Sequence, residues 1–330
     1  MDDVKSQLRL DENEAYEETE DTGYHPKAFN EFERWFKRQT TIHGRRDLKD
    51  LLFKMLLSVV VIIVCMPFFM VLIQVGTVGM GVLLGSGPGQ GLDFFLSTPG
   101  PGLQGGVLNA IAGTAYLVGI AMLVGVPLSL FGAIYITEYT RPGFMRSSVE
   151  FAADVLAGIP SIVFGAFGFT FLVIYLRIGM GMLAGGLTLA FMMIPTVLRT
   201  TQEALRQVPM SLREASLALG ATKWTTTWKI TIRAAFPGII TGVLLAMGRV
   251  MGETAPLIFT SGNNLGLPTS VTGPGSWVAS MPYTVWSYIS DPRNYVNDKA
   301  QATALTLMGM VLLIDLIANF ISRKVTRRLV

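Results

Sequence analysis

The chain has 330 residues, of which 51% are hydrophobic and only 15% are charged. Soluble domains carry about 25% charged residues, so this composition excludes a typical soluble enzyme and favours a membrane protein with several spans. The formal net charge of +3 is unevenly distributed: residues 1–50 carry 13 acidic and 9 basic side chains, and the rest carry 10 and 17. We therefore expect basic loops on one side of a membrane and no binding of nucleic acid.

The residue types that usually build catalytic and metal sites are scarce in this sequence. The single cysteine, Cys65, lies in an apolar run, and the two histidines, His25 and His43, lie in the polar N-terminal segment. An internal disulfide, a cysteine-based metal site and a histidine-dependent catalytic triad in the body of the chain are therefore excluded. We expect this chain to hold no cofactor or metal of its own.

The first 50 residues are polar and acidic. Residues 1–24 contain nine acidic and two basic side chains and almost nothing apolar to bury, so they are predicted to be disordered. Aromatic residues at helical spacing, with basic residues between them, then predict a short interfacial helix. The segment lacks the features of a cleavable signal peptide, so the first apolar segment is expected to serve as an uncleaved anchor. The predicted domains are 1–50, the tail and interfacial helix, and 51–330, the six-span transmembrane domain.

Six apolar segments follow, and each is long enough to cross about 30 Å of hydrocarbon as a helix. They lie near 52–75, 107–136, 151–176, 180–198, 237–261 and 301–321. Lys and Arg are concentrated before the first segment, in the 2–3 and 4–5 loops, and at the C-terminus. Both termini and the 4–5 loop are therefore predicted to be cytoplasmic. The expected fold class is an all-α membrane protein with six transmembrane helices, located in the cell membrane.

Two further features of these segments bear on function. The loop between the first two is rich in glycine, but no part of the sequence contains G-x-x-x-x-G-K-[ST], so we expect no nucleotide site and no ATP hydrolysis in this chain. Prolines also fall inside or near the ends of the segments. They predict either kinks that open backbone groups on a transport pathway or simple helix bending. These prolines are Pro127, Pro160, Pro195 and Pro256.

The most polar interruption is the stretch 203–235, between the fourth and fifth segments. Ser211 and Glu214 form an S-x-x-E capping box, which predicts the start of a helix, and Gly220 stands where a left-handed C-cap belongs. A second helix is predicted from about Thr222, with two tryptophans on one face and basic residues beside them. This periodicity alone is typical of amphipathic helices that lie on the lipid surface.

The order of residues in this stretch resembles the EAA loop of ABC-importer permeases, whose pattern is E-A-A, three residues, G, nine residues and I-x-L-P. Arg233 stands in place of the proline, so the angle at which the chain leaves the loop stays open. The resemblance implies a type I ABC-importer permease fold in which this loop forms cytoplasmic coupling helices. These helices would dock on a separate ATP-binding subunit, where ATP and magnesium would be bound. The matching residues are Glu214, Ala215 and Gly220, followed by I-T-I at 230–232, and Ser216 stands in place of the second alanine.

The fifth segment carries two charges inside an apolar run. Arg249 and Glu253 are four residues apart, hence on one face of a helix, and a charge at mid-membrane costs a few kcal/mol or more. One interpretation is a structural salt bridge. The other is that Arg249 contacts an anionic substrate, because a guanidinium fork matches a tetrahedral oxyanion, while Glu253 holds Arg249 between transport steps and Thr254 adds a hydroxyl. Arg199, at the end of the fourth segment, is either a second basic contact or an ordinary residue of a basic cytoplasmic loop.

Two motifs in the membrane segments resemble those of PstA-type permeases of phosphate ABC importers. They are G-R at 248–249 followed by G-E-T-A-P-L at 252–257, and A-G-I-P-S-I-V-F-G at 157–165. The likeness covers roughly residues 107–321. It implies import of inorganic phosphate, with three partners: a second phosphate permease subunit in a heterodimer, a dimer of ATP-binding subunits, and an extracytoplasmic phosphate-binding protein.

The sequence therefore predicts the permease subunit of an ATP-driven phosphate importer that works by alternating access. A permease for another oxyanion, such as sulfate or molybdate, is the nearest alternative. A proton-coupled secondary carrier would use Arg249, Glu253 and Asp315 as a relay and would not need the EAA-like loop. An intramembrane enzyme is disfavoured, because no nucleophile–base or metal constellation is present. Asp154, inside the third segment, and Asp315, inside the sixth, are further candidates for buried acids and are assigned no specific role.

Overall fold

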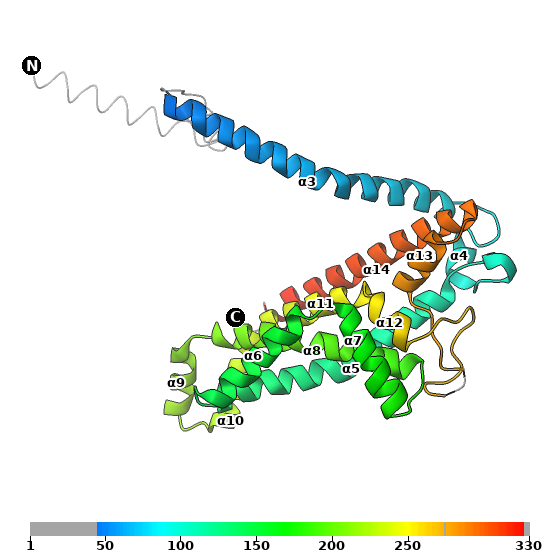
Figure 1. Cartoon of the computed structure of the whole chain (residues 1–330). Coiled ribbons are helices and arrows are strands. Elements are labelled where there is room, and N and C mark those ends of the chain that lie inside the picture. The colour runs from blue at the N-terminus through cyan, green and yellow to red at the C-terminus, as the bar shows by residue number, and fades with distance from the viewer. Residues whose placement is uncertain (1–44, 274, 327–330) are drawn as a thin grey trace, which may run out of the picture. The chain divides into compact units, whose positions relative to one another are not determined.

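The computed structural model describes residues 45–273 and 275–326, and every regular element in these ranges is a helix (Figure 1). The predicted acidic tail and interfacial helix lie outside the described residues. Contacts between residues divide the chain into two units, 1–69 and 70–330, and the boundary falls inside the first long helix.

That helix is α3 (Arg45–Leu83), which contains the first predicted span and extends beyond it at both ends. The helix continues through Pro67, and beyond Lys54 its side chains are uncharged and mostly apolar on all sides. Most of them are exposed; Ile62 and Ile63, for example, are each 63% exposed. A helix that is apolar all round is typical of a membrane span.

Four further helical runs in the second unit are long and apolar enough to cross a membrane. With α3 they account for five of the six predicted segments, and a bent helix pair accounts for the sixth. The four are α5 (Leu108–Ile134) with its π turn η2 (Tyr135–Tyr139), α8 (Met182–Arg206), the continuous run α10 (Lys223–Thr226), η4 (Thr227–Thr231) and α11 (Ile232–Met251), and α14 (Asn294–Thr326).

The bent pair corrects the prediction of one span over 151–176. α6 (Phe144–Gly158) meets α7 (Ser161–Gly168), which continues as the π segment η3 (Phe169–Tyr175), at an angle of 102°. Pro160 stands in the break, with φ −57° and ψ 140°. Proline disfavours helical backbone at the residue before it, which explains why α6 ends there.

The fifth predicted segment is interrupted as well. α11 ends three residues before α12 (Ala255–Thr260) begins, and the residues between them are G-E-T. α12 packs on α7, so the two breaks lie close together. Gly165 of α7 permits this approach, because a methyl group there would come within 2.7 Å of the Pro256 Cα. The sequence motifs at 157–165 and 252–257 are thus brought into contact.

The core of the second unit lies between α5, α8 and α11, which pack together (Figure 1). Gly185 of α8 allows close packing, since a methyl group there would come within 2.8 Å of the Leu117 side chain. The buried side chains are aliphatic residues and methionines, among them Leu117, Leu189, Met193, Ala246, Met247 and Val250.

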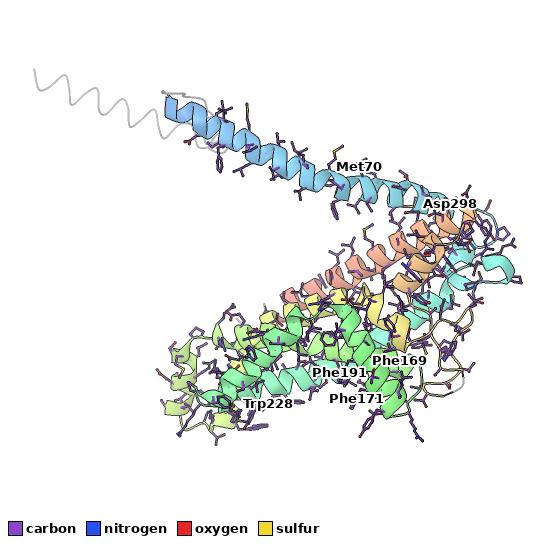
Figure 2. All side chains as sticks on the ribbon, in the orientation of Figure 1. Met70, Phe169, Phe171, Phe191, Trp228 and Asp298 are labelled. Atoms are coloured by element: carbon purple, nitrogen blue, oxygen red, sulfur yellow. The ribbon has the colours of Figure 1, made fainter. Side chains whose placement is uncertain are left out.

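The connecting segments gather at the two ends of these helices. α9 (Met210–Ala218) and α10 lie at one end, and α4 (Leu92–Leu96) and α13 (Met281–Ile289) lie at the other (Figure 1). Figure 2 shows the same separation for two side chains, with Trp228 at the α9 end and Asp298 at the α13 end. The helix–turn–helix segment and the glycine-rich loop are therefore on opposite sides of the spans.

At the α13 end, the glycine-rich loop is fastened to the beginning of α14. The Lys299 ammonium donates to the carbonyls of Leu103 and Gly105, at 2.7 and 2.5 Å. Arg293 donates to the Gly102 carbonyl at 2.7 Å. These bonds give the loop a defined position despite its glycine content.

Candidate functional site

The helix–turn–helix segment predicted over 203–235 is present, but its first helix begins differently. α9 starts at Met210, directly after Pro209, and its N-terminus has no side-chain cap. Ser211 is already inside the first turn, so the predicted capping box with Glu214 is wrong. Pro209 explains the start, because proline has no backbone N–H and does not fit in a helix interior.

The left-handed C-cap predicted at Gly220 is confirmed. Its φ is +82°. The Gly220 N–H donates to the Leu217 carbonyl at 2.9 Å, and the Ala221 N–H donates to the Ser216 carbonyl at 3.2 Å. This pair of bonds is a Schellman motif, which satisfies the last carbonyls of α9 and turns the chain toward α10.

The second helix of the segment is the beginning of a membrane span. Thr222 caps α10, since its hydroxyl accepts from the Thr225 N–H at 3.2 Å. From there the helix runs without a break through η4 and α11 to Met251. Arg233, which replaces the proline of the EAA pattern, lies in the middle of this continuous helix. The chain therefore leaves the loop as part of the same helical run, and α10 is continuous with the span.

The outer surface of the segment combines charge with apolar groups. Glu214 and Ala215 are exposed, and Ser216 is half-buried, with its hydroxyl 2.9 Å from that of Thr226. This surface fits both predicted placements, on a partner protein and on lipid. The exposed large apolar residues are Met210, Leu212, Leu217, Leu219 and Trp224.

Arg249 and Glu253 come together at the break between α11 and α12, not on one uninterrupted helix as predicted. Arg249 is in the last turn of α11, where the helix dipole favours a cation, and Glu253 lies beyond the helix end. The Arg249 Nε is 3.9 Å from the Glu253 Oε1, which is beyond hydrogen-bond distance. Their side chains are 45% and 17% exposed. The pair is loose, and its cation is the more accessible member.

Two other predicted groups lie on elements next to this pair. Thr254 directly follows Glu253 and is the last residue before α12, so its hydroxyl is carried by the same break. Asp315 is half-buried on α14, which packs against α11.

Arg199 belongs to a different polar cluster, between α6 and α8. It forms an ion pair with Asp154, and its Nη2 donates to the Glu150 carbonyl at 2.8 Å. The Asp154 side chain is 64% exposed, so the expectation of a buried acid there is wrong. Arg199 is engaged with α6 and not with the Arg249–Glu253 pair.

The same cluster continues toward the end of α8. The Glu150 carboxylate is 3.0 Å from the Arg146 Nε and 2.5 Å from the Arg206 Nη2. Three arginines and two acids therefore link α6 to α8, and this network carries a net positive charge.

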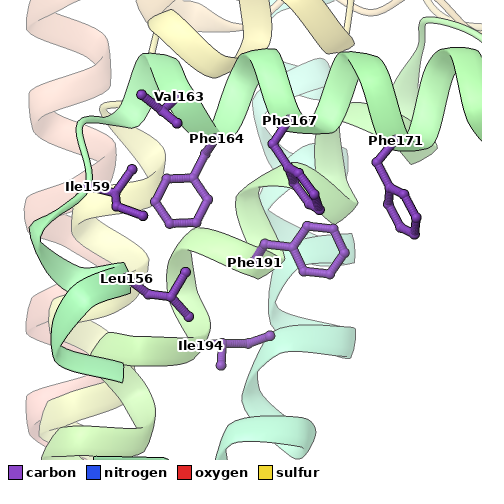
Figure 3. Close-up of a pocket in the computed structure, with 8 residues that line it drawn as sticks. All are labelled: Leu156, Ile159, Val163, Phe164, Phe167, Phe171, Phe191 and Ile194. Atoms are coloured by element: carbon purple, nitrogen blue, oxygen red, sulfur yellow. The ribbon is translucent and has the colours of Figure 1, made fainter. Parts of the chain in front are cut away.

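An apolar cavity of about 480 Å³ lies where the α6–α7 bend meets α8 (Figure 3). The phenylalanines at its wall contact one another: Phe167 is stacked on Phe171 and packs edge-on against Phe191. All eight lining side chains are apolar, so this cavity does not suit an anion. They are Leu156, Ile159, Val163, Phe164, Phe167, Phe171, Phe191 and Ile194.

A further ion pair was not predicted from the sequence. Arg213 of α9 lies 3.0 Å from Glu138 of η2, and the two side chains are 17% and 9% exposed. The sequence offers one weak signal, an acid at the end of the second apolar segment, where the other charges are basic. Nothing in the pattern pairs it with a residue 75 positions later.

Over residues 45–273 and 275–326, no three His, Cys, Asp or Glu side chains lie close enough to hold a metal ion. The polar chemistry of this part of the chain is carried by arginine–carboxylate pairs.

The chain is similar to proteins of one transport family. The family model described as binding-protein-dependent transport system inner membrane component matches residues 125–329. The phosphate transport system permease protein PstA of Yersinia pestis is 39% identical over 259 residues, which are 78% of this chain and 85% of that protein. The phosphate transport system permease protein PstA 2 of Mycobacterium tuberculosis is 40% identical over 226 residues, covering 68% and 74%.

Solved structures show the same fold at low sequence identity. A bacterial ABC transporter involved in the import of alginate matches with a TM-score of 0.60 and 18% identity, over 86% of this chain and 100% of that chain. The MetNI methionine ABC transporter in an inward-facing conformation matches with a TM-score of 0.51 and 20% identity, over 66% of this chain and 93% of that chain. The predicted fold class, an ABC-importer permease, is confirmed.

Proposed function

Because the chain belongs to the family of binding-protein-dependent transport system inner membrane components, we propose that it is the permease subunit of an ATP-driven importer of inorganic phosphate. The relatives that are named phosphate transport system permeases support the substrate. As a multi-pass inner-membrane component, the chain provides the pathway and not the energy source. ATP and magnesium are then bound by a separate ATP-binding subunit.

The observation that carries this proposal is the accessible guanidinium of Arg249 at a break between two membrane helices. Discontinuous helices near mid-membrane often form substrate sites, because their unpaired backbone groups line a cavity. Here two broken runs, α6–α7 and α11–α12, pack on each other at Gly165 and Pro256. A phosphate ion needs a fixed cation at such a place to offset its loss of hydration.

The loose geometry of the pair suggests how phosphate binds and leaves. Without phosphate, Glu253 partly neutralises Arg249 at 3.9 Å. Phosphate then takes a forked contact with the guanidinium, the Thr254 hydroxyl adds a hydrogen bond, and Glu253 recovers its partner after release. Arg199 is a second basic contact on the way out, where exchange with Asp154 keeps the charge compensated.

The proposed partners follow from the surfaces that the chain presents. We place α9 and both termini on the cytoplasmic side, in agreement with the basic loops. Glu214, Ala215, Ser216 and Gly220 then form the coupling loop on a dimer of ATP-binding subunits. The exposed apolar faces of the spans suit lipid and a second phosphate permease subunit in a heterodimer. The glycine-rich loop faces an extracytoplasmic phosphate-binding protein.

Uptake of radiolabelled phosphate into vesicles that contain the assembled complex tests the proposal. ATP is enclosed in one set of vesicles and left out of the other. We expect uptake only with ATP, and its loss in Arg249→Gln with the complex still assembled. Arg177→Gln is the matched control, because Arg177 is an exposed arginine between η3 and α8, outside both the α11–α12 break and the 203–235 segment.

The alternatives predict other outcomes of the same experiment. Uptake without ATP would indicate a secondary carrier. Stronger uptake of sulfate or molybdate than of phosphate would indicate a permease for another oxyanion. Full uptake by Arg249→Gln would remove Arg249 from the pathway.

A further inference from the structure

The helix–turn–helix segment contacts α5 through η2, and two adjacent residues of this π turn each receive a cation. Arg213 of α9 pairs with Glu138. Lys223 of α10 lies over the ring of Tyr139, 5.2 Å from its centre. Both helices of the segment therefore place a positive charge on the same turn of α5. Single π turns inside α-helices are often found at functional sites.

Arg213 joins three elements at once. Its Nη2 donates to the Leu205 carbonyl near the end of α8 at 2.6 Å, and the same atom is 3.0 Å from the Glu138 Oε1. The hydrogen bond is directed at the carbonyl, and Glu138 is held by charge. Since both side chains are largely buried, the attraction is weakly screened by solvent.

The rest of α9 offers no comparable attachment. The helix has no buried residue. In the described part of the chain, the other hydrogen bonds of α9 side chains stay within the segment: Arg213 Nη1 donates to the Met210 sulfur at 3.8 Å, and the Ser216 hydroxyl pairs with that of Thr226. Arg213 is thus the side chain that ties α9 to the spans α5 and α8.

We propose that the Arg213–Glu138 pair is a positioning device that transmits the movement of α9 to α5. This inference rests on the proposed function, in which α9 is moved by an ATP-binding subunit. α10 moves its own span, because it is continuous with α11, but α9 has no such continuity with α5. The ion pair supplies the missing link, so that spans two, four and five respond together.

The test compares transport with ATP hydrolysis in the complete complex, reconstituted in vesicles. Glu138→Gln removes the charge but keeps the shape, and it leaves Arg213 with its bond to the Leu205 carbonyl. We expect this variant to assemble and to hydrolyse ATP at near wild-type rate, but to import several-fold less phosphate per ATP. Arg213→Lys keeps the charge but replaces the planar guanidinium by a compact ammonium on a different stem, so its phosphate import per ATP is expected to fall between that of the wild type and that of Glu138→Gln.

Arg206→Gln is the matched control. It breaks an ion pair with Glu150 near the same end of α8, but that pair joins α6 to α8 and does not involve α9. Phosphate imported per ATP is expected to be unchanged. An unchanged ratio in Glu138→Gln, or an equal loss in Arg206→Gln, would overturn the inference.

A second measurement does not depend on the substrate. With Cys65 replaced by serine, spin labels at Leu217→Cys on α9 and Tyr135→Cys on η2 report the distance between the two elements in the assembled complex. Both positions are about half exposed, at 47% and 55%. We expect a narrow distance distribution with Glu138 and a broad one with Glu138→Gln. Equal widths would reject the link, whereas a lack of phosphate uptake by the wild type would reject only the proposed function.

Discussion

Two arginine–glutamate pairs in this chain have the same chemistry and opposite geometry. Arg249 and Glu253 are four residues apart and 3.9 Å from each other, and the arginine is 45% exposed. Arg213 and Glu138 come from different helices, lie at 3.0 Å and are 17% and 9% exposed. The first pair is able to exchange its partner for a soluble anion. The second is suited to hold two helices in register, because separating the pair would leave a buried charge without a partner.

The largest expected difference between the pairs is in stability. Arg213→Met leaves the Glu138 carboxylate buried without its cation, which costs about 3 kcal/mol. Arg249→Met removes a partner from a looser, more accessible pair and is expected to cost less than about 1 kcal/mol. The unfolding midpoint of the purified complex in detergent should therefore fall clearly in the first variant and little in the second. Equal shifts would show that burial does not separate the two pairs.

The second effect is on the kinetics of uptake. In the proposed exchange mechanism, Glu253→Gln leaves Arg249 uncompensated in the empty transporter, so phosphate no longer has to displace a carboxylate. We expect KM for phosphate to fall about tenfold, equivalent to about 1.4 kcal/mol, and the maximal rate to fall because release is slower. Glu253→Asp keeps the charge and should change KM less. Initial rates of ATP-driven uptake measure both, and a higher KM in Glu253→Gln contradicts the exchange mechanism.

A third, smaller effect concerns the turn that orients α9 for its link to Glu138. Gly220→Ala meets no atom within 4 Å, but φ of +82° costs a residue with a Cβ about 1 kcal/mol. The backbone amides of residues 220 and 221 close the Schellman motif. We expect both to exchange hydrogen faster in the Gly220→Ala variant than in the wild type. Gly220→Asn should be milder, because asparagine tolerates this conformation.

Gly158→Ala is the matched control for the turn. This glycine also has open space around its Cβ position, and it ends an ordinary helix without a positive φ. Gly158→Ala is therefore expected to leave the stability of this helix end unchanged or to raise it slightly. Similar exchange rates in both alanine variants would mean that the left-handed turn does not limit the order of α9.

The parts of the fold that depend on local chemistry could be predicted from the sequence. Long apolar runs predict the spans, and Gly220 predicts its turn because few other residues adopt that backbone. Ser211 misled because Pro209 starts the helix two residues earlier, and a proline in this position dominates a capping hydroxyl. Pro160 predicts a bend, but its angle of 102° was beyond prediction, since neither a proline nor the length of an apolar run reveals the direction in which the chain continues.

The candidate site divides in the same way. Arg249 and Glu253 stand out because charges are rare inside apolar segments, and their neighbours in the sequence are also neighbours in space. The prediction that both lie on one continuous helix was wrong, because α11 ends between them. Arg213 and Glu138 look like ordinary charges at the ends of spans. Only the packing of α9 on η2 brings them together, and no periodicity encodes a contact between positions 75 apart.

A third pair gives the smallest effect and a test of pH dependence. The Asp291 carboxylate accepts from the Arg293 side chain at 2.8 and 2.7 Å and from its backbone N–H at 3.0 Å. These bonds, with the side-chain bonds first, lower the pKa of Asp291 from 3.8 to about 2. A lowered pKa in the folded state means that the stabilisation is complete above about pH 4 and is lost as the pH falls through about 2.

Asp291→Asn lacks this contribution at every pH, so the difference between the variant and the wild type reports it. We expect a small difference in unfolding midpoint that is constant from pH 7 to pH 5 and shrinks between about pH 4 and pH 2. A difference that already shrinks between pH 7 and pH 5 would contradict the lowered pKa. Because the pair is local and solvent-accessible, its loss should leave the amount of phosphate imported per ATP unchanged. Short distances alone therefore do not make an ion pair a mechanical link; the link at Glu138 requires burial and partners on separate helices as well.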